Sequence, residues 1–433
     1  MAKMLVRNSF WSCLILCCLT FVEVTGQNIY KARAIMDTLA SPAMFGRGYV
    51  NDGCGIAAEY IANEMKNIGL KSFDSKFKQE FQVNVKTYPS KVSIKMDGKI
   101  LKAGEEFSVM TGSPSVKGIF KIVVIDSSWF KRFRKIERLK KKDLSNTLIV
   151  YNQAQMKGKY KKMADSLLKS NYLGCAGFIN VIDKSSVTWS VNSPEKILPY
   201  PVLTVVSSVM TSDPSLVEIN IELKPIDEYV IGNVTGYIEG TAQPDSFVVI
   251  TAHYDHLGMM GDEAFFPGAN DNASGTAMML DMASYYINEN NRLPYSLVFM
   301  AFAGEEIGLK GSMYAADHPL FPLDKIKFLI NLDMVGTGSE GITMVNGAQF
   351  PAYYDKMVKI NADNEYILKV VKRGESCNSD HCPFYKKGVP AVFIYSMGNE
   401  HTEYHSLKDQ AQKVPLTEYE DIFRLIRDFI NTL

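Results

Sequence analysis

Hydrophobic residues in the second half of the chain gather in short, nearly uninterrupted runs. Four such runs are Phe247–Thr251, Tyr295–Phe302, Ile326–Leu332 and Val389–Tyr395. Strands that are covered on both faces have this character. Stretches with helical spacing of apolar positions separate or follow them: Ser274–Glu289, Leu309–Asp317, Ala352–Ala362 and Thr417–Leu433. The alternation predicts an α/β fold with a mixed, largely parallel sheet and helices on both faces.

The segment before this region has a different pattern. Residues 29–70 are predicted to be helical, since Ile56, Ile61, Met65 and other apolar residues recur near one helix face and Gly69 provides a stop. A strand is predicted at Glu80–Val85.

Residues 88–225 contain short alternating runs, such as Gly118–Ile125 and Asn146–Tyr151, with helical material between them. No histidine lies in this stretch, and all six histidines of the chain lie between His253 and His405. We therefore expect a catalytic domain formed by residues 27–87 and 226–433, interrupted by a smaller, strand-rich inserted domain at 88–225.

The N-terminus predicts export. Lys3 and Arg7 precede an apolar run over Phe10–Val22, which is shorter than the roughly 20 residues of a membrane span. Small residues follow at 24–26, so residues 1–26 are interpreted as a signal peptide and the chain as secreted or periplasmic. An uncleaved N-terminal anchor and a lipoprotein are the alternatives; no stable membrane insertion of the mature chain is expected.

Composition and charge bear on the kind of partner the chain binds and on its possible disulfides. The chain has 433 residues, 46% hydrophobic and 22% charged, and 47 basic residues balance 47 acidic ones. A net charge of zero gives no reason to expect nucleic-acid binding. Outside the signal segment four cysteines remain, Cys54, Cys175, Cys377 and Cys382, which allow three pairings; Cys377 and Cys382 could close a small loop.

Possible metal ligands follow the predicted strands. His253, Asp255 and His256 end the first run, Glu305 and Glu306 follow the second, and further candidates occur along the chain. The set interpreted as metal ligands is His253, Asp271, Glu306, Asp333 and His405. Imidazoles with carboxylates suit zinc, and five ligands exceed the need of one catalytic zinc. They fit two ions sharing a carboxylate, for which Asp271, at a helix start, is the natural bridge.

These motifs resemble those of the secreted dizinc aminopeptidase family. The matching segments are His253-Tyr-Asp255, Asn270–Gly275, Gly304–Ser312, Leu332–Met334 and Tyr404-His405. The resemblance implies a zinc exopeptidase fold and removal of N-terminal residues from peptides by a water held between two zinc ions. It pairs His405 with Glu306 on one zinc and His253 with Asp333 on the other, with Asp271 on both.

The resemblance also implies further roles. Glu305 would be the general base, Asp255 would accept the free ring N–H of His253, and Tyr404 would donate to the tetrahedral oxyanion. Asp409 is expected to support His405. Residues 88–225 would correspond to a protease-associated lid domain.

Other interpretations stay open. A dipeptidase or carboxypeptidase uses the same ligands, a single-zinc glutaminyl cyclase needs fewer, and a non-catalytic receptor would have lost some. His256, His318 and His401 are expected to lie outside the ligand set, and His381 is intermediate. The sequence leaves the residue preference and the oligomeric state open.

Overall fold

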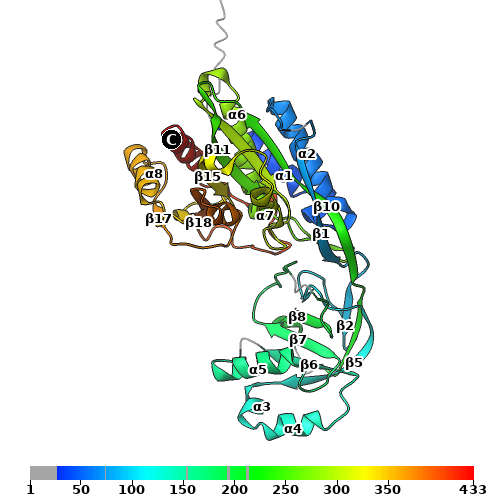
Figure 1. Ribbon diagram of the computed structural model, residues 1–433. Helices are drawn as coiled ribbons and strands as arrows, with labels where there is room; N and C mark the ends of the chain where they lie inside the picture. Colours follow the sequence, from blue (N-terminus) through cyan, green and yellow to red (C-terminus); the bar gives the residue numbers. More distant parts are fainter. Residues whose placement is uncertain (1–26, 74, 153–154, 193–195, 211–213) are drawn as a thin grey trace, which may run out of the picture.

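The computed structural model describes residues 27–73, 75–152, 155–192, 196–210 and 214–433. The predicted signal segment at 1–26 lies outside these ranges. Two eight-stranded sheets organise the described chain, one above the other in Figure 1. Within the described ranges, no helix has the length and apolar character that crossing a membrane would require.

The first sheet has the strand order β1-β10-β14-β11-β15-β18-β16-β17. Its centre consists of four parallel strands, which are β14 (Tyr295–Phe302), β11 (Gln243–His253), β15 (Ile326–Leu332) and β18 (Ala391–Met397). On one side β10 (Lys224–Ile238) pairs antiparallel with β14, and β1 (Lys78–Thr87) pairs antiparallel with β10 at the edge. On the other side β16 (Gly341–Val345) pairs antiparallel with β18, and β17 (Val370–Lys372) pairs parallel with β16 at the edge. The predicted fold class, a mixed and largely parallel sheet, is confirmed.

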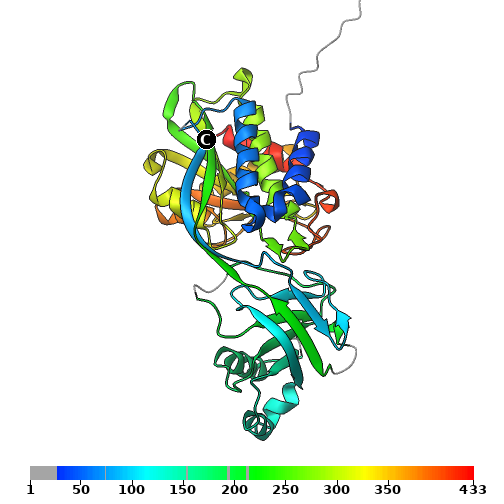
Figure 2. The ribbon, with the colours of Figure 1, turned by 90° about the vertical axis from the view of Figure 1, so that its right-hand side faces the viewer.

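Helices cover both faces of this sheet, as Figures 1 and 2 show. On one face α1 (Ile29–Leu39), α2 (Gly53–Ile68), α6 (Ser274–Tyr286) and α10 (Tyr419–Ile430) share one core with Val248 and Ile250 of β11. On the other, α7 (Lys310–Asp317) and α9 (His381–Lys386) pack near Phe247 and Val249. Alternate residues of β11 therefore enter opposite cores, which explains its continuous apolar run.

Two local predictions need correction. Residues 29–70 do not form one helix, because α1 and α2 are separated by two short 3-10 turns (Pro42–Arg47 and Val50–Asp52). Left-handed backbone at several residues of these turns, including Arg47 with φ 53°, breaks the helical path. In addition, β10, β16, β17 and α9 were not predicted.

The second sheet is formed by strands between residues 93 and 221, in the order β3-β2-β9-β5-β6-β7-β8-β4. These are β2 (Ser93–Met96), β3 (Lys99–Ile100), β4 (Phe107–Val109), β5 (Val116–Ile125), β6 (Thr147–Asn152), β7 (Gly177–Ile182), β8 (Val202–Val206) and β9 (Leu216–Ile221). Its helices are α3 (Ser127–Lys131), α4 (Arg134–Lys140) and α5 (Lys159–Lys169). We refer to residues 88–223 as the inserted unit.

The chain enters and leaves the inserted unit through two paired strands. β1 and β10 run antiparallel, and their last pair joins Thr87 to Lys224. The Thr87 hydroxyl also donates to the Lys224 carbonyl oxygen at 2.8 Å. The two crossings thus form one continuous ribbon, visible between the sheets in Figure 2.

Candidate metal centre

The candidate ligands gather at the carboxyl ends of the parallel strands, where open α/β sheets hold their ligands. His253 is the last residue of β11, Asp333 directly follows β15, and Glu306 lies in the turn after β14. Asp271 comes from the turn that leads into α6, and His405 from the loop after β18. The structure brings all five together, and each is at most 8% exposed.

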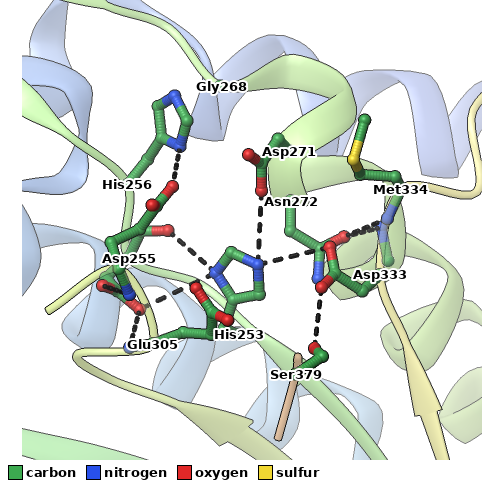
Figure 3. Close-up of polar contacts among 12 residues, drawn as sticks. His253, Asp255, His256, Gly268, Asp271, Asn272, Glu305, Asp333, Met334 and Ser379 are labelled. Carbon is green, nitrogen blue, oxygen red and sulfur yellow. Dashed lines mark hydrogen bonds and ion pairs between the residues drawn. The ribbon is translucent and has the colours of Figure 1, made fainter. Parts of the chain in front are cut away.

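Asp271 lies between the two histidines. Its Oδ1 is 3.3 Å from His253 Nε2, and its Oδ2 is 3.2 Å from His405 Nε2. His253 Nε2 is also 3.4 Å from Asp333 Oδ1, while His405 Nε2 is 3.2 Å from Glu306 Oε2. Figure 3 shows the His253 ring between Asp271 and Asp333. The Asp271 carboxylate therefore contacts the histidine of two imidazole–carboxylate pairs: His253 with Asp333, and His405 with Glu306.

The donor set fits metal ions. Ligand atoms of His253, Asp271 and Asp333 lie within 4.8 Å of one another, and so do those of His256, Asp271 and Glu306. Among the described residues, buried His405 Nε2 and Glu306 Oε1 have no hydrogen-bond partner despite their close neighbours. Buried polar atoms that converge without bonding one another suit a shared cation. Nitrogen and carboxylate ligands in this mixture favour zinc.

The buried ionisable side chains of the site shift one another's pKa values. Burial opposes the charge on Asp271, but the close contacts with His253 and His405 outweigh it and hold its pKa well below the ordinary range. Burial likewise opposes the charge on His405, yet contacts with Asp271 and Glu306 raise its pKa to about 10. Glu305 behaves differently, because burial raises its pKa well above the usual value and nearby His253 only partly opposes this.

Asp255 contacts His253 differently from the expectation. The ring nitrogen Nδ1 lies 3.2 Å from the main-chain oxygen of Asp255 and 3.8 Å from its carboxylate. The carboxylate accepts instead from the backbone N–H groups of Glu305 at 3.1 Å and Glu306 at 3.3 Å. Asp255 thus orients His253 through its carbonyl and fixes the double-glutamate turn through its side chain.

The prediction that Asp409 supports His405 is wrong, because the Asp409 carboxylate contacts other groups. Its carboxylate accepts from the backbone N–H of Asn270 at 2.9 Å and of Asp271 at 3.1 Å. The other contact is with His401 Nε2 at 2.8 Å. The pair of Asp409 and His401 therefore holds the backbone that presents Asp271.

His256 lies inside the site, although the prediction from the sequence placed it outside the ligand set. Its side chain is fully buried, and Nδ1 lies 2.8 Å from Glu306 Oε1. Glu306 is thus flanked by His256 and His405, whose rings lie 5.7 Å apart. The only signal for this in the sequence is that His256 follows the His-x-Asp motif directly. His381 and His318 lie elsewhere: His381 Nε2 contacts the Ser376 carbonyl oxygen, and His318 stacks on Tyr314.

Arg47 is a supporting residue that the sequence analysis missed. It is fully buried and donates to the backbone oxygens of Tyr254 (2.6 Å), Leu39 (2.8 Å), Pro267 (2.6 Å) and Gly268 (2.7 Å), with Asp271 at 3.4 Å. Burial lowers its pKa to about 10, against the attraction of nearby carboxylates, so it stays charged near neutral pH. Arg47 connects the first helix, the end of β11 and the Asp271 turn.

The remaining predicted residues border open space. Glu305 and Tyr404 line a pocket together with His253, Asp271 and Asp333. Tyr404 is 51% exposed, and its ring stacks on that of His405 with centroids 3.8 Å apart. Ser379 donates to Asp333 Oδ2 at 2.7 Å and so orients this carboxylate, as Figure 3 shows.

The inserted unit reaches the site through one loop. The backbone N–H of Trp189 donates to the carbonyl oxygen of His405 at 3.0 Å. Ser190 and Asn192 line a second pocket with Glu305 and Glu306. The inserted unit therefore forms one wall of the metal centre.

The similarity to known sequences lies mainly in the part of this chain that carries the candidate metal ligands. Residues 233–430 match the profile described as Peptidase family M28. Aminopeptidase YwaD of Bacillus subtilis (strain 168) is 31% identical over 208 residues, which are 46% of this chain and 43% of that protein. A probable zinc metalloprotease of Pyricularia oryzae is 37% identical over 115 residues, 26% of this chain and 22% of that protein. The chain spans about half or less of the length of these curated relatives.

Solved structures match over nearly the whole length. BSAP, a zinc aminopeptidase from Bacillus subtilis, superposes with a TM-score of 0.69 over 94% of this chain and 95% of that one, at 19% identity. An aminopeptidase from Aneurinibacillus sp. strain AM-1 gives 0.61 over 93% of both chains, at 17% identity. At these identities the likeness shows the fold.

Proposed function

Because residues 233–430 match the profile of peptidase family M28, we propose that this chain is a zinc metalloaminopeptidase that hydrolyses N-terminal residues from peptides. The observation that carries the proposal is the position of Asp271, whose two oxygens each face a different buried imidazole. Such a bridging carboxylate is what a pair of metal ions requires. The names of the similar proteins, aminopeptidase and zinc metalloprotease, agree with this reaction.

Five residues would hold two zinc ions. His253 and Asp333 would bind one, His405 and Glu306 the other, and Asp271 both; His256 would hold the second oxygen of Glu306 in place. The ions would supply an acidified water and an electrophile for the peptide carbonyl. His405 is preferred to His256 as a ligand because its Nε2 approaches both Asp271 and Glu306, each at 3.2 Å.

Glu305 is proposed as the general base. It lines the pocket beside His253 and Asp333, and its backbone N–H is fixed by Asp255. Its carboxylate would take a proton from the attacking water and return it to the leaving amine. The exposed phenol of Tyr404 borders the same pocket, where it could donate to the oxyanion of the tetrahedral intermediate.

Domain roles and export belong to the same proposal. Residues 27–87 and 226–433 would form the catalytic domain, and 88–225 a protease-associated-like domain that limits access to the site. Export is supported by the charged and apolar pattern of residues 1–26 and by the disulfide between Cys377 and Cys382. Fractionation of the producing cells, with N-terminal sequencing of the recovered protein, tests this proposal. Protein confined to the cytoplasm would contradict export, and exported protein that keeps residue 1 would contradict cleavage after residue 26.

The central experiment is the Glu305→Gln substitution. Turnover of an aminoacyl p-nitroanilide should fall by about 10²- to 10⁴-fold, the usual contribution of a general base. Zinc content, measured by elemental analysis, should stay near two ions per chain. Glu340→Gln serves as the control, because this carboxylate contacts Asn399 away from the pocket. Near-normal turnover of the Glu305 variant would exclude the assigned base.

A substrate panel tests the direction of attack. Peptides with a free N-terminus should be hydrolysed, and the same peptides with an acetylated N-terminus should not, with or without a free C-terminus. A chelator should abolish the activity and added zinc restore it. Cleavage of the acetylated peptides from their C-terminus would show a carboxypeptidase instead.

A further inference from the structure

A small pocket borders the metal centre on the side of β16 and β18. It has a volume of about 250 Å³, and four of its lining residues are His253, Asp271, Glu305 and Asp333. The other lining residues are Met334, Arg373, Asn378, Phe393, Tyr395 and Tyr404. Sites for drug-sized ligands occupy roughly 300–1,000 Å³. This pocket therefore has room for one residue of a substrate.

The wall away from the metal centre is aromatic with a cation at its rim. Phe393 and Tyr395 pack with ring centroids 5.3 Å apart. Arg373 is exposed, and among the lining residues it is the only lysine or arginine. Within the part of the chain that the structure describes, the side chains of Arg373, Asn378 and Tyr395 form no hydrogen bond or ion pair. Three donor-bearing side chains are thus available to a ligand.

The backbone that carries Arg373 is firmly placed. Its N–H donates to the Met344 carbonyl oxygen, and its own carbonyl oxygen accepts from Ala348 N–H, both at 3.1 Å. Further along, Ser376 N–H donates to Asn346 Oδ1 at 3.1 Å. A loop attached in this way to β16 and its following turn can present a long side chain to a defined position.

No carboxylate of the chain neutralises this guanidinium among the described residues. Glu375, the nearest in sequence, accepts from the Tyr385 hydroxyl at 3.2 Å. The other carboxylates of the pocket, Asp271, Glu305 and Asp333, belong to the metal centre. A planar guanidinium with free donors is well suited to bind a carboxylate through two hydrogen bonds.

The rest of a peptide substrate can lie in the open space beside Glu305, outside the small pocket. The second pocket beside Glu305 is lined by Ser190, Asn192 and Gly308. Ile307 and Lys310, which flank this turn, border a larger cleft of about 730 Å³ along β1, between the two sheets. The small pocket therefore fits the N-terminal residue, and the open side fits the chain that follows the scissile bond.

We propose that Arg373 binds the side-chain carboxylate of the substrate's N-terminal residue, so that the enzyme prefers peptides that begin with glutamate or aspartate. The inference rests on the proposed aminopeptidase function and specifies its substrate class. Asn378 and Tyr395 add neutral donors beside the guanidinium, and Phe393 packs against the methylene groups of the bound side chain.

The test compares two nearly isosteric substrates, the p-nitroanilides of glutamate and glutamine, by their kcat/KM ratio with zinc-loaded enzyme. A charge-assisted pair predicts a preference for glutamate of about 10-fold or more. Arg373→Gln should bring the ratio to about one or below. Arg373→Glu should reverse the preference and favour the lysine substrate over the glutamate one. Arg138→Gln, at an exposed arginine of α4 in the inserted unit, is the matched control and should keep the parental ratio.

The outcomes separate this inference from the proposed function. Hydrolysis of leucine and glutamine substrates without a preference for glutamate would overturn the specificity and leave the aminopeptidase activity standing. Failure to hydrolyse any N-terminally free substrate would overturn both. A third arm compares dipeptides with free and amidated C-termini. If Arg373→Gln removed only the preference for the free C-terminus, Arg373 would bind the opposite end of the substrate and the inference would be wrong.

Discussion

Replacement of Arg47 by methionine should destabilise the protein more than any exposed substitution, although the Arg47 side chain reaches the pocket-lining residues only at the backbone oxygen of Asp271. The change keeps most of the buried volume and removes all five donors. Of the four backbone oxygens that now accept at 2.6–2.8 Å, those of Tyr254, Leu39 and Pro267 would lose the partner that the described residues give them, whereas Gly268 would keep the Ala273 N–H at 3.2 Å. A buried acceptor without a partner costs about 1–3 kcal/mol.

The expected loss is therefore about 3–9 kcal/mol of unfolding free energy, and rearrangement or entering water that satisfies some of the oxygens would reduce it. This is a large share of the roughly 5–15 kcal/mol that holds a typical domain folded. Arg47→Lys should recover part of the loss, because an ammonium group keeps the charge and three donors. Among the segments affected, residues 247–275 should lose most protection, since three of the four acceptors lie there.

Urea unfolding followed by circular dichroism measures the total effect, and hydrogen exchange of peptides from residues 247–275 measures the local one. Arg424→Met is the control, because Arg424 is exposed and pairs only with Asp421 one helical turn away; its effect should stay within about 0.5 kcal/mol. If Arg47→Met unfolded within 1 kcal/mol of the parent protein and kept its exchange protection, the network would be unimportant for stability.

Three further predictions concern stability and metal binding. Burial raises the pKa of Asp281 to about 7, well above its value in the unfolded chain, so stability should fall as the pH rises from about 4 to 7. Asp281→Asn should remove this dependence and stabilise the protein at pH 8 by up to about 4 kcal/mol in thermal or urea unfolding. Gly275→Ala should cost about 1–3 kcal/mol and reduce activity, because a Cβ would lie 2.4 Å from both Asn272 Oδ1 and the Leu332 oxygen. Zinc binding near pH 7 should release protons, measurable by calorimetry in buffers of different ionisation enthalpy, because His405 carries a proton in the metal-free protein.

Each of these predictions has a contradicting result. Equal pH dependence of Asp281→Asn and the parent would show that this carboxyl is ionised in both states. Gly374→Ala, where a Cβ would meet nothing within 4 Å, is the control for Gly275→Ala, and equal stability of the two variants would contradict the close packing. A zinc-binding enthalpy that does not depend on the buffer would show that no net proton is released and would contradict this prediction.

The central strands of the first sheet were predictable because strands that are buried on both faces are almost continuously hydrophobic. Tyr295–Phe302 and Ile326–Leu332 have the predicted bounds to the residue. β10 escaped prediction because its first half is exposed and polar as it crosses between the sheets. The break between α1 and α2 depends on left-handed residues such as Phe45 and Asn51, which apolar periodicity does not register.

In the site, the residue types were predictable and the contacts were not. Ligand motifs at strand ends pointed to His253 and Asp333, because parallel strands bring their carboxyl ends together. The roles of Asp409 and His256 depend on loop paths that no local pattern fixes. Arg47 was missed for the same reason, since its partners are backbone oxygens, which leave no trace in the identity of the residues that carry them.

The ribbon formed by β1 and β10 has a consequence for how such proteins diversify. Thr87 and Lys224 face each other as the first pair of a hairpin would, so a tight turn could replace the whole inserted unit without rethreading the sheet. Recombination at this junction would leave His253, Asp271 and the other metal-facing residues in place while replacing the wall that carries Ser190 and Asn192. A lineage could thus acquire a new substrate range in one genetic step, with the hydrolytic chemistry inherited unchanged.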